Sequence, residues 1–338
     1  MKHWIHAAAA SLALGLAGPA AADDVAGVPI AEHACQRACL EGYVERYLAA
    51  MAKGGFDDAL FARDVRFTEN GIELPLGNEG LWATTSSAEG YRLVVPDVET
   101  QQVAALVTVK EEAGSSATGP QRPAEPVGVS LRLRINAEGK ISEVEQIAAR
   151  PERPLGPNAG PPSSPFPATG AAVEAMVKPW AGYSEAVPAG KRHTRAELVA
   201  VADAYFEAVE RNTGKDYYPF TDDCLRYENG IITAGAPDAE RPNRLGCTAQ
   251  LQTSLIGAVT SIRDRRIVAV DRERGIAFAF AFFDHRPINW SWQLGELFKI
   301  EDGKISRIEA IFIRGPYGIC SGWSTYEQCR SEEPQDIR

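Results

Sequence analysis

Several common functional signals are missing from this chain of 338 residues, and each absence narrows its function. After the first two dozen residues, no segment is apolar enough to span a bilayer. No phosphate-binding loop, dinucleotide-binding glycine pattern, nucleophile elbow or zinc-helix motif occurs. The five histidines and six cysteines do not cluster as zinc ligands do. We therefore expect no metal site.

Basic residues are also fewer than acidic ones. The chain has 35 lysines and arginines against 45 aspartates and glutamates, which gives a net charge of −10. A general nucleic-acid binder needs a basic face, so we expect no nucleic-acid partner. The acidic balance favours solubility and says little about the substrate.

The N-terminus has the pattern of an export signal at residues 1–22. Lys2 gives a positive start, residues 7–16 form a short apolar run, and three alanines at 20–22 precede Asp23. The alternatives are an uncleaved anchor and a buried helix, although the run is too short to span a bilayer. We expect a periplasmic or secreted protein.

Six cysteines in an exported chain indicate three disulfides. Neighbour pairing is the simplest of the fifteen connectivities that six cysteines allow. It joins Cys35 to Cys39, Cys224 to Cys247, and Cys320 to Cys329.

The chain contains one pattern twice. Residues 66–71 read Arg-Phe-Thr-Glu-Asn-Gly and residues 226–230 read Arg-Tyr-Glu-Asn-Gly. Each copy follows an amphipathic helical pattern with a late tyrosine, Tyr47 or Tyr205. Each also precedes a Gly-Lys-Ile-Ser hairpin by about 70 residues. A repeat that keeps its order and spacing indicates two related domains.

Hydrophobic periodicity predicts similar elements in both copies. In the first we expect helices over 31–51 and 56–61, strands over 65–68, 74–82, 91–98, 102–111, 127–136 and 140–149, and an exposed loop at 113–126. In the second we expect helices over 195–212 and 249–260, and strands over 265–271, 276–284, 290–300 and 304–313. Thr194 and Glu197 form a predicted capping box.

These elements divide the chain into a signal peptide at 1–22, a first domain at 31–150, a proline-rich linker at 151–192, a second domain at 193–315 and a tail at 316–338. Residues 168–192 of the linker are expected to pack across a domain. Helices followed by hairpins predict an α+β fold. We expect two cone-shaped domains, each with N-terminal helices packed in a curved antiparallel sheet. The inside of such a cone suits a small apolar ligand.

The tyrosine-bearing helix, the Glu-Asn-Gly hairpin and the Gly-Lys-Ile-Ser-x-x-Glu strand resemble the nuclear transport factor 2-like superfamily, and within it the SnoaL-like proteins. The resemblance covers most of the mature chain twice. It includes the Cys-x-x-x-Cys-Leu at 35–40 seen in secreted proteins of this type. It implies an acid/base site inside the cone and no cofactor. The Asp-His and Tyr-Asp patterns of the superfamily's dehydratases and ketosteroid isomerases are not matched.

The second domain carries most of the candidate catalytic residues. His285 is a candidate general acid or base, and the alternative is a strand-end histidine held by Asp284 or Asp264. Glu228 is a candidate catalytic carboxylate, although Glu-Asn-Gly also simply builds a tight hairpin. Glu309 would have a raised pKa if buried, or would pair with an arginine.

Polar and aromatic residues around these three are candidates for substrate binding. If strands 265–271 and 276–284 pair, the arginine run at 263–266 and His285 lie at one end of the sheet. Guanidinium groups and amides can hold an oxyanion or a carboxylate, and tryptophans can line a pocket for a ring. The substrate-binding candidates are Arg226, Asn229, Arg265, Arg266 and Trp292.

Two hypotheses follow. The first is an exported, cofactor-independent lyase, isomerase or hydrolase that acts on a small apolar or aromatic oxygenated molecule in the second cone. The second is a non-catalytic module that binds a small ligand or forms a homodimer through the outward face, phenylalanine or alanine, of strand 276–284. A polysaccharide-active enzyme is a third reading, based only on export and paired carboxylates.

Overall fold

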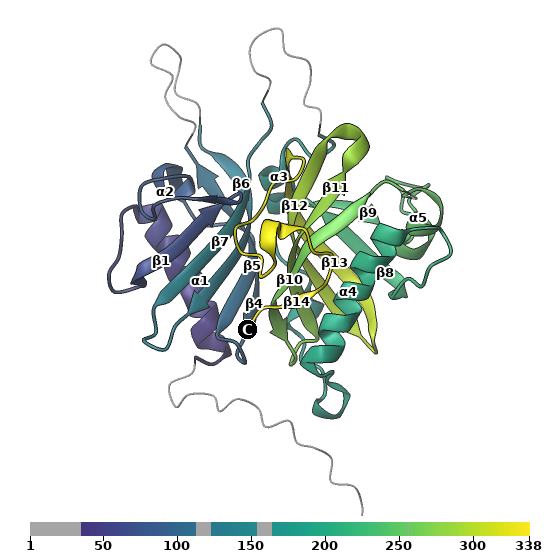
Figure 1. Ribbon diagram of the computed structural model, residues 1–338, viewed down its shortest axis with the longest axis horizontal. Helices are drawn as coiled ribbons and strands as arrows, with labels where there is room; N and C mark the ends of the chain where they lie inside the picture. Colours follow the sequence, from purple (N-terminus) through teal and green to yellow (C-terminus); the bar gives the residue numbers. More distant parts are fainter. Residues whose placement is uncertain (1–34, 113–122, 154–163, 256) are drawn as a thin grey trace, which may run out of the picture.

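The protein folds into two curved-sheet domains that pack side by side (Figure 1). The structure is a computed structural model that describes residues 35–112, 123–153, 164–255 and 257–338. The expected signal peptide and the centres of the expected loop at 113–126 and of the proline-rich stretch lie outside these residues. Within the described chain each domain has one seven-stranded sheet and few helices, which makes an α+β protein.

The first domain wraps its sheet around helix α1 (Arg37–Lys53). The sheet order is β2-β1-β7-β6-β5-β3, with β4 also paired to β5. Its other elements are β1 (Phe61–Glu69), β2 (Ile72–Glu73), α2 (Leu81–Thr84), β3 (Thr85–Ser87), β4 (Arg92–Asp97), β5 (Gln102–Glu111), β6 (Glu125–Ile135) and β7 (Ile141–Ala149).

The second domain repeats this plan around helix α4 (Arg195–Arg211). The sheet order is β14-β10-β11-β12-β13-β8-β9. Its elements are β8 (Phe220–Glu228), β9 (Ile231–Ala234), α5 (Cys247–Thr253), β10 (Ser261–Asp271), β11 (Ile276–His285), η3 (Arg286–Ile288), β12 (Trp290–Glu301), β13 (Lys304–Pro316), η4 (Glu327–Cys329) and β14 (Gln335–Asp336).

The connecting segment packs between the domains. It contains α3 (Thr169–Ala175) and the short 3₁₀ turns η1 (Ala181–Ser184) and η2 (Ala189–Lys191). Val173 and Tyr183 belong to a buried cluster that also contains residues of both sheets. The segment therefore contributes to the core, as a strap across a domain would.

Several expectations about the elements are wrong. The sheets are mixed, because β1 runs parallel to β7 and β8 runs parallel to β13. The segment 56–61 is not a helix, because its apolar residues turn into β1 at Phe61. The return arm after Asn70-Gly71 is only β2, and the chain then turns to α2. The predicted helix at 249–260 ends at Thr253, and β14 was not expected.

Each sheet has one face on its own helix and one face on the other domain. The alternation in β11 shows the division: Ala277, Ala279 and Ala281 pack in the core around α4, whereas Phe278 and Phe280 pack between the domains. Leu106 of β5 is buried in the same interdomain cluster. The phenylalanine face expected to form a homodimer is thus covered by the first domain.

The contact between the domains is approximately two-fold, as in an isologous dimer. Arg37 at the start of α1 donates to Asp271 of the second domain over 2.7 Å. The matching Arg195 at the start of α4 donates to Asp97 of the first domain over 2.6 Å. Both arginines and both aspartates occupy equivalent positions in the repeat, so the sequence duplication extends to the interface.

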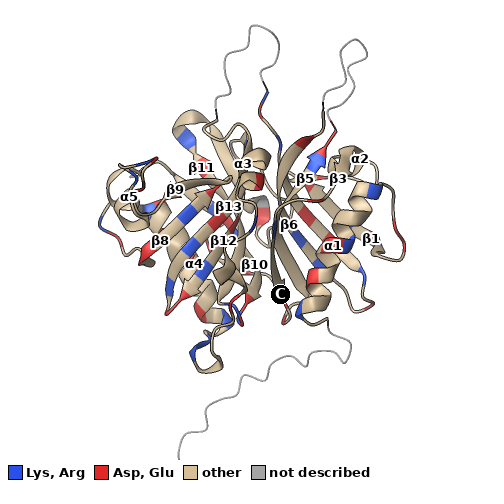
Figure 2. Cartoon of the chain, turned by 180° about the vertical axis from the view of Figure 1, so that it is seen from behind, with Lys and Arg blue, Asp and Glu red and all other residues tan. Residues whose placement is uncertain are grey.

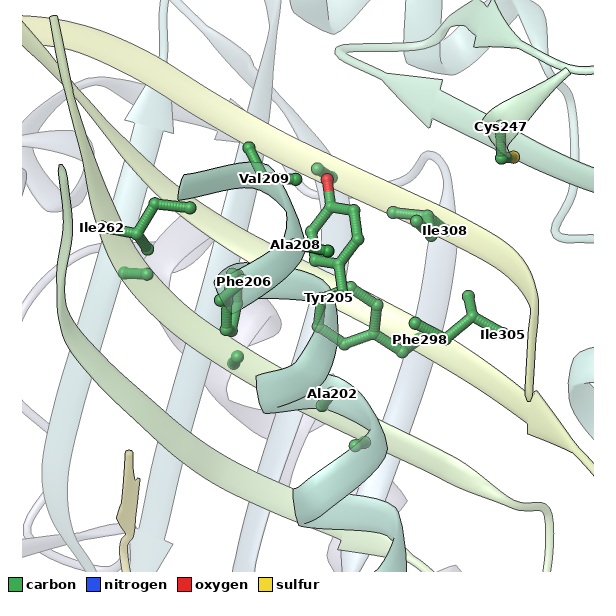
Figure 3. Close-up of a cluster of buried hydrophobic side chains, with 14 of the residues drawn as sticks. Ala202, Tyr205, Phe206, Ala208, Val209, Cys247, Ile262, Phe298, Ile305 and Ile308 are labelled. Carbon is green, nitrogen blue, oxygen red and sulfur yellow. The ribbon is translucent and has the colours of Figure 1, made fainter. Parts of the chain in front are cut away.

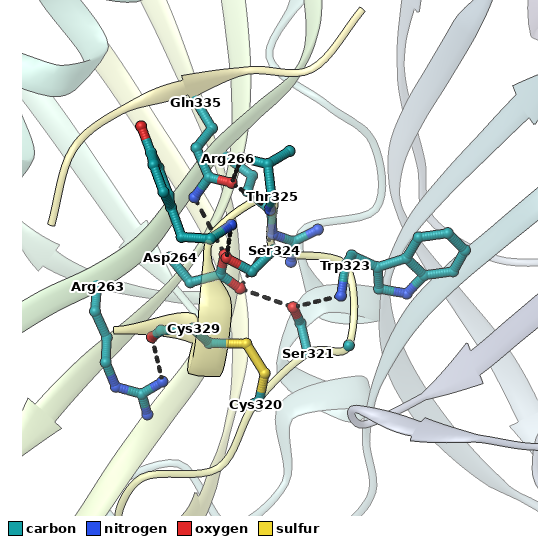
Figure 4. The surroundings of a disulfide bond; sticks show 12 residues. Arg263, Asp264, Arg266, Cys320, Ser321, Trp323, Ser324, Thr325, Cys329 and Gln335 are labelled. Carbon is teal, nitrogen blue, oxygen red and sulfur yellow. Dashed lines mark hydrogen bonds and ion pairs between the residues drawn. A yellow bond between two sulfur atoms is a disulfide. The ribbon is translucent and has the colours of Figure 1, made fainter. Parts of the chain in front are cut away.

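The C-terminal tail lies across both domains, and the predicted disulfides are all present. Figure 4 shows the Cys320–Cys329 bridge beside Asp264, which accepts hydrogen bonds from Ser321 and Gln335. Trp323 donates from Nε1 to Thr68 of the first domain over 2.7 Å. The tail therefore fastens the second domain to the first.

Charged residues of both signs occur on both domains (Figure 2). No helix among the described residues is both long enough and apolar enough to cross a membrane.

Candidate functional site

The second cone is built around Tyr205 of α4. Thr194 caps this helix as predicted: its side chain accepts from the Glu197 backbone, and Glu197 accepts from Thr194 in return. Tyr205 reaches from the helix toward the strands that carry Phe298 and Ile308 (Figure 3). It is fully buried, which raises its pKa well above the ordinary value.

Three residues that pair side by side across neighbouring strands form one rung of the sheet beneath Tyr205. In this rung two glutamates flank an alanine. Glu296 of β12 pairs with Ala310 of β13, and Ala310 pairs with Glu228 of β8. Side chains on one rung share a face, and two strand spacings separate the outer Cα atoms by about 10 Å. Glu296 is 2% exposed, and the Glu228 side chain is 17% exposed.

The two carboxyl groups have different environments. Burial raises the pKa of Glu296 to about 8; Glu228 raises it further, while Arg226 and a hydrogen bond with Tyr205 oppose the rise. Glu228 Oε2 lies 3.7 Å from Nε of Arg226. Burial works against the charge of Arg226, but Glu228, Tyr205 and Glu296 outweigh it and raise the pKa of Arg226. At neutral pH the site therefore combines a protonated carboxyl group with an ion-paired carboxylate.

One oxygen of the Glu296 carboxyl group lacks a hydrogen-bond partner in the described chain. Its Oε2 is buried and finds no hydrogen-bond partner among the residues that the structure describes. A buried polar atom of this kind costs free energy unless something else uses it. Such a group in a cone is a candidate for substrate contact.

The equivalent rung of the first cone is closed by its own side chains. It consists of Leu131, Gln146 and Glu69 on the corresponding strands. Tyr47 donates to Gln146 over 2.8 Å, and Gln146 donates to Glu69 over 2.9 Å. Trp82 donates in turn to the Tyr47 hydroxyl over 3.2 Å. The polar groups of this rung are therefore used in a structural network.

The second cone differs at two of the three rung positions. Ala310 stands where the first cone has the bridging Gln146, and Glu296 stands where it has Leu131. The first change removes the bridge below the tyrosine, and the second adds an ionisable group facing it. This asymmetry is what separates a closed core from a candidate active site.

An open hollow of about 430 Å³ is lined by residues of β9, of α5 and of the loop between them, and none of the three rung residues lines it. Thr233 of β9 and Gln250 of α5 line it, and both accept hydrogen bonds from the Arg226 side chain. The Cys224–Cys247 disulfide joins β8 to α5 and so holds Gln250 near Arg226. Thr233 and Gln250 therefore lie between the Arg226 guanidinium group and the solvent in this hollow.

The structure assigns Asn229 to the hairpin. Its Oδ1 accepts from the Phe312 backbone over 2.8 Å, and its Nδ2 donates to the Phe312 carbonyl over 3.1 Å. Asn70 makes the same pair of bonds to Ala148 in the first domain. The repeated asparagine thus ties the Glu-Asn-Gly turn to the parallel strand beside it.

His285 does not join Glu228. It pairs with Trp290, which pairs with Pro316, six residues along β13 from the partner of Glu228. That offset is about 20 Å along the strand. Its Nδ1 lies 3.1 Å from the Phe283 carbonyl oxygen, and burial lowers the pKa of His285. Strands β10 and β11 pair as expected, and Arg263 at the start of the arginine run donates to Asp284, the neighbour of His285, over 2.9 Å. The expected meeting of His285 with Glu228 is wrong, because register separates the two.

Glu309 and Arg266 face the first domain, whereas Arg265 packs against α4. Glu309 lies between the domains, where it accepts from the Tyr91 hydroxyl, and burial raises its pKa to about 7. Arg266 donates to Glu145 of the first domain over 2.7 Å through two nitrogens. Arg265 donates to Asp203 and Glu210 of α4. These residues join structural elements and are not placed to hold a substrate in the cone.

Trp292 lies at the rim of the second cone. Its ring stacks on Phe312 with centroids 4.8 Å apart and lies 4.6 Å from the His285 ring. It also lines a groove between the two domains.

Sequence reasoning named Glu228 and Arg226 but missed Glu296 and the role of Tyr205. A signal was available for Glu296. Leu294, Glu296 and Phe298 alternate along β12 toward the core, so the glutamate occupies an inward position in an apolar strand.

Comparisons with known proteins show no family for the chain as a whole. A family model described as a domain of unknown function, DUF8021, matches residues 191–312. No curated protein matches the chain. Among solved structures, the chain is similar to a de novo designed protein with a curved β-sheet (18% identity, 36% of this chain and 88% of that one, TM-score 0.25). It is also similar to an LEH-like epoxide hydrolase of M. tuberculosis (15% identity, 40% and 90%, TM-score 0.26) and to the IdmH 96-104 loop truncation variant (12% identity, 35% and 91%, TM-score 0.23). TM-scores this low leave the superfamily assignment a proposal.

Proposed function

We propose that the second domain is a cofactor-independent acid/base catalyst of the lyase or isomerase type, acting on a small, largely apolar carbonyl compound. The observation that carries the proposal is the Glu296–Ala310–Glu228 rung, with one buried carboxyl of raised pKa and one ion-paired carboxylate. A buried carboxyl group of raised pKa and a neighbouring carboxylate that is ion-paired can share the roles of acid and base. The resemblance of the sequence to the nuclear transport factor 2-like superfamily agrees with such a site.

The groups around the rung have complementary tasks. Protonated Glu296 and the Tyr205 hydroxyl can both donate to a carbonyl oxygen. Glu228 can accept a proton from the carbon next to that carbonyl, so the C–H electrons move into an enolate. Returning the proton to another carbon isomerises the substrate. Expelling a leaving group from the β-carbon makes the reaction a lyase reaction. Arg226 fixes the orientation of Glu228.

Two further parts of the proposal concern location and assembly. Three disulfides suit a protein that folds in an oxidising compartment, such as the periplasm or the cell exterior. Phe278 and Phe280 are buried within one chain. The phenylalanine face of β11 is therefore not exposed to form a homodimer.

Proton exchange tests the proposal without a known product. The mature protein would be incubated in D₂O with a panel of ketones, including 1-indanone, 2-tetralone and cyclohexenone, and α-deuteration followed by ¹H NMR. We expect Glu228→Gln and Glu296→Leu to slow exchange by about 100-fold or more. Glu301→Gln, an exposed glutamate on the same strand as Glu296, should leave it unchanged. Absence of exchange over the whole panel, or equal rates in all variants, would refute the proposal.

A further inference from the structure

A second site lies on the approximate two-fold axis between the domains. A groove of about 240 Å³ is lined by equivalent residues of the two copies. Asn70 matches Asn229, and Arg150 matches Arg314. Phe166 of the connecting segment lines it as well. The groove is therefore a product of the duplication, yet its two halves have different chemistry.

The half from the second domain is aromatic. Trp292 stacks on Phe312, and Phe166 meets Phe312 edge-on with centroids 5.2 Å apart. Trp290 also lines the groove. The first domain has Ala148 where the second has Phe312, so that side of the groove is small. A flat ring fits such a slot, because aromatic walls on one side and a small residue opposite leave room for one.

The two arginines that line the groove, Arg150 and Arg314, differ in their ion pairs. Arg150 is neutralised by Glu69 at 2.7 Å and by Glu111 at 2.8 Å. Arg314 is exposed and lies over the Trp290 ring, 4.5 Å from its centroid. No ion pair of Arg314 is found among the residues that the structure describes. The remaining lining charge, Glu152, accepts a backbone hydrogen bond from Ser164. As far as the described residues go, the groove therefore offers one cation without an ionic partner next to an aromatic wall.

We infer that this groove binds a small aromatic carboxylate, with its ring against the tryptophan wall and its anionic group on Arg314. A guanidinium group suits a planar carboxylate because it can donate two parallel hydrogen bonds. The volume suits a molecule of one or two rings. The side-chain amides of Asn70 and Asn229 are held by backbone groups, so the arginine supplies the charge recognition.

This site is separate from the acid/base rung. Phe312 and Trp292 lie between the groove and the rung, and Glu296 is four residues further along β12 than Trp292. Binding in the groove therefore does not depend on the proposed catalytic function.

Calorimetry with 2-naphthoate and its neutral analogue 2-naphthamide tests the inference on the full mature chain. We expect naphthoate to bind more tightly than the amide, and Arg314→Ala to weaken naphthoate binding about tenfold or more while leaving the amide unaffected. Arg314→Lys should restore part of the affinity.

Arg307→Ala is a matched control. Arg307 lies on the same strand and also packs over a tryptophan, Trp180, with 4.6 Å to the ring centroid, but it is remote from the groove lining. It should bind naphthoate as the unmodified chain does, and so should Glu296→Gln. No binding of naphthoate, equal binding of the amide, or unchanged affinity in Arg314→Ala would overturn the inference.

Discussion

Raising the pH through neutrality should destabilise the packing of the two domains, because Glu309 is buried between them. This residue is 5% exposed and accepts a hydrogen bond from Tyr91 of the first domain. Tyr183 of the connecting segment is a second hydrogen-bond partner. Burial dominates over both bonds and raises the pKa of Glu309 to about 7 from an ordinary 4.5. Three parts of the chain therefore meet at one titrating group.

The sign and size of the effect follow from linkage. Between these two pKa values the folded state binds more protons than the unfolded state, so the free energy of unfolding falls as the pH rises. The stability due to neutral Glu309 is complete below the unfolded pKa and is lost as the pH rises through the folded pKa. A displacement from 4.5 to about 7 corresponds to about 3 kcal/mol. That is a large share of the stability of an ordinary domain.

Glu309→Gln isolates this contribution. The amide keeps an oxygen that accepts from Tyr91 but cannot ionise. Urea unfolding without reductant, at several values between about pH 5 and pH 9, should give a variant whose stability relative to the unmodified chain rises by about 3 kcal/mol over that range. Glu138→Gln, on the exposed turn between β6 and β7, serves as control. If the curves of Glu309→Gln and the unmodified chain run parallel, the reasoning fails, because Glu309 would then ionise at its ordinary pKa.

Three other substitutions test the packing and the site. Ala310→Gln should restore the bridge seen in the first cone and slow ketone exchange at least about tenfold in the NMR assay, with little change in melting temperature. Gly295→Ala should lower the free energy of unfolding by about 1–3 kcal/mol in urea, because its Cβ would lie 2.6 Å from that of Ser130 across the interface. Asn229→Ala should cost about 1–3 kcal/mol in the same measurement, because both backbone groups of Phe312 would lose their partners. Unchanged exchange in the first case, or unchanged stability in the other two, would contradict these expectations.

Features set by local sequence were predictable. The capping box of α4 needs only Thr194 and Glu197 at the right spacing, and it formed. The strict Phe-Ala alternation fixed which face of β11 each residue occupies, because the side-chain period of a strand is two. Neighbour pairing of the cysteines was also confirmed.

Features set by residues distant in the sequence were not predictable. The parallel pairing of β1 with β7 joins strands separated by most of the domain, and hairpin signals say nothing about such pairs. The same limit explains His285 and Glu309. Both lie in predicted strands, but strand order, register and the second domain decide what they face. Glu296 is a different case: the alternation of β12 predicts its inward position, but it stands alone among apolar residues and outside the polar clusters that mark the other candidates.

The duplication in one chain permits an asymmetry that a homodimer of the same fold could not have. Ser130 and Gly295 occupy equivalent positions and meet each other near the two-fold axis, where a Cβ on the glycine would clash. In a homodimer both positions would carry the same residue, so two serines would collide and two glycines would leave a gap. With two linked copies, one side can be small and the other larger. The same freedom applies inside the cones, where Gln146 bridges one rung by hydrogen bonds and Ala310 leaves the other rung without such a bridge. The rung of the first copy is thus hydrogen-bonded to its tyrosine and within itself, while in the second copy the buried Oε2 of Glu296 has no partner in the described chain. This difference between the copies is why we propose catalysis for the second domain and structural support for the first.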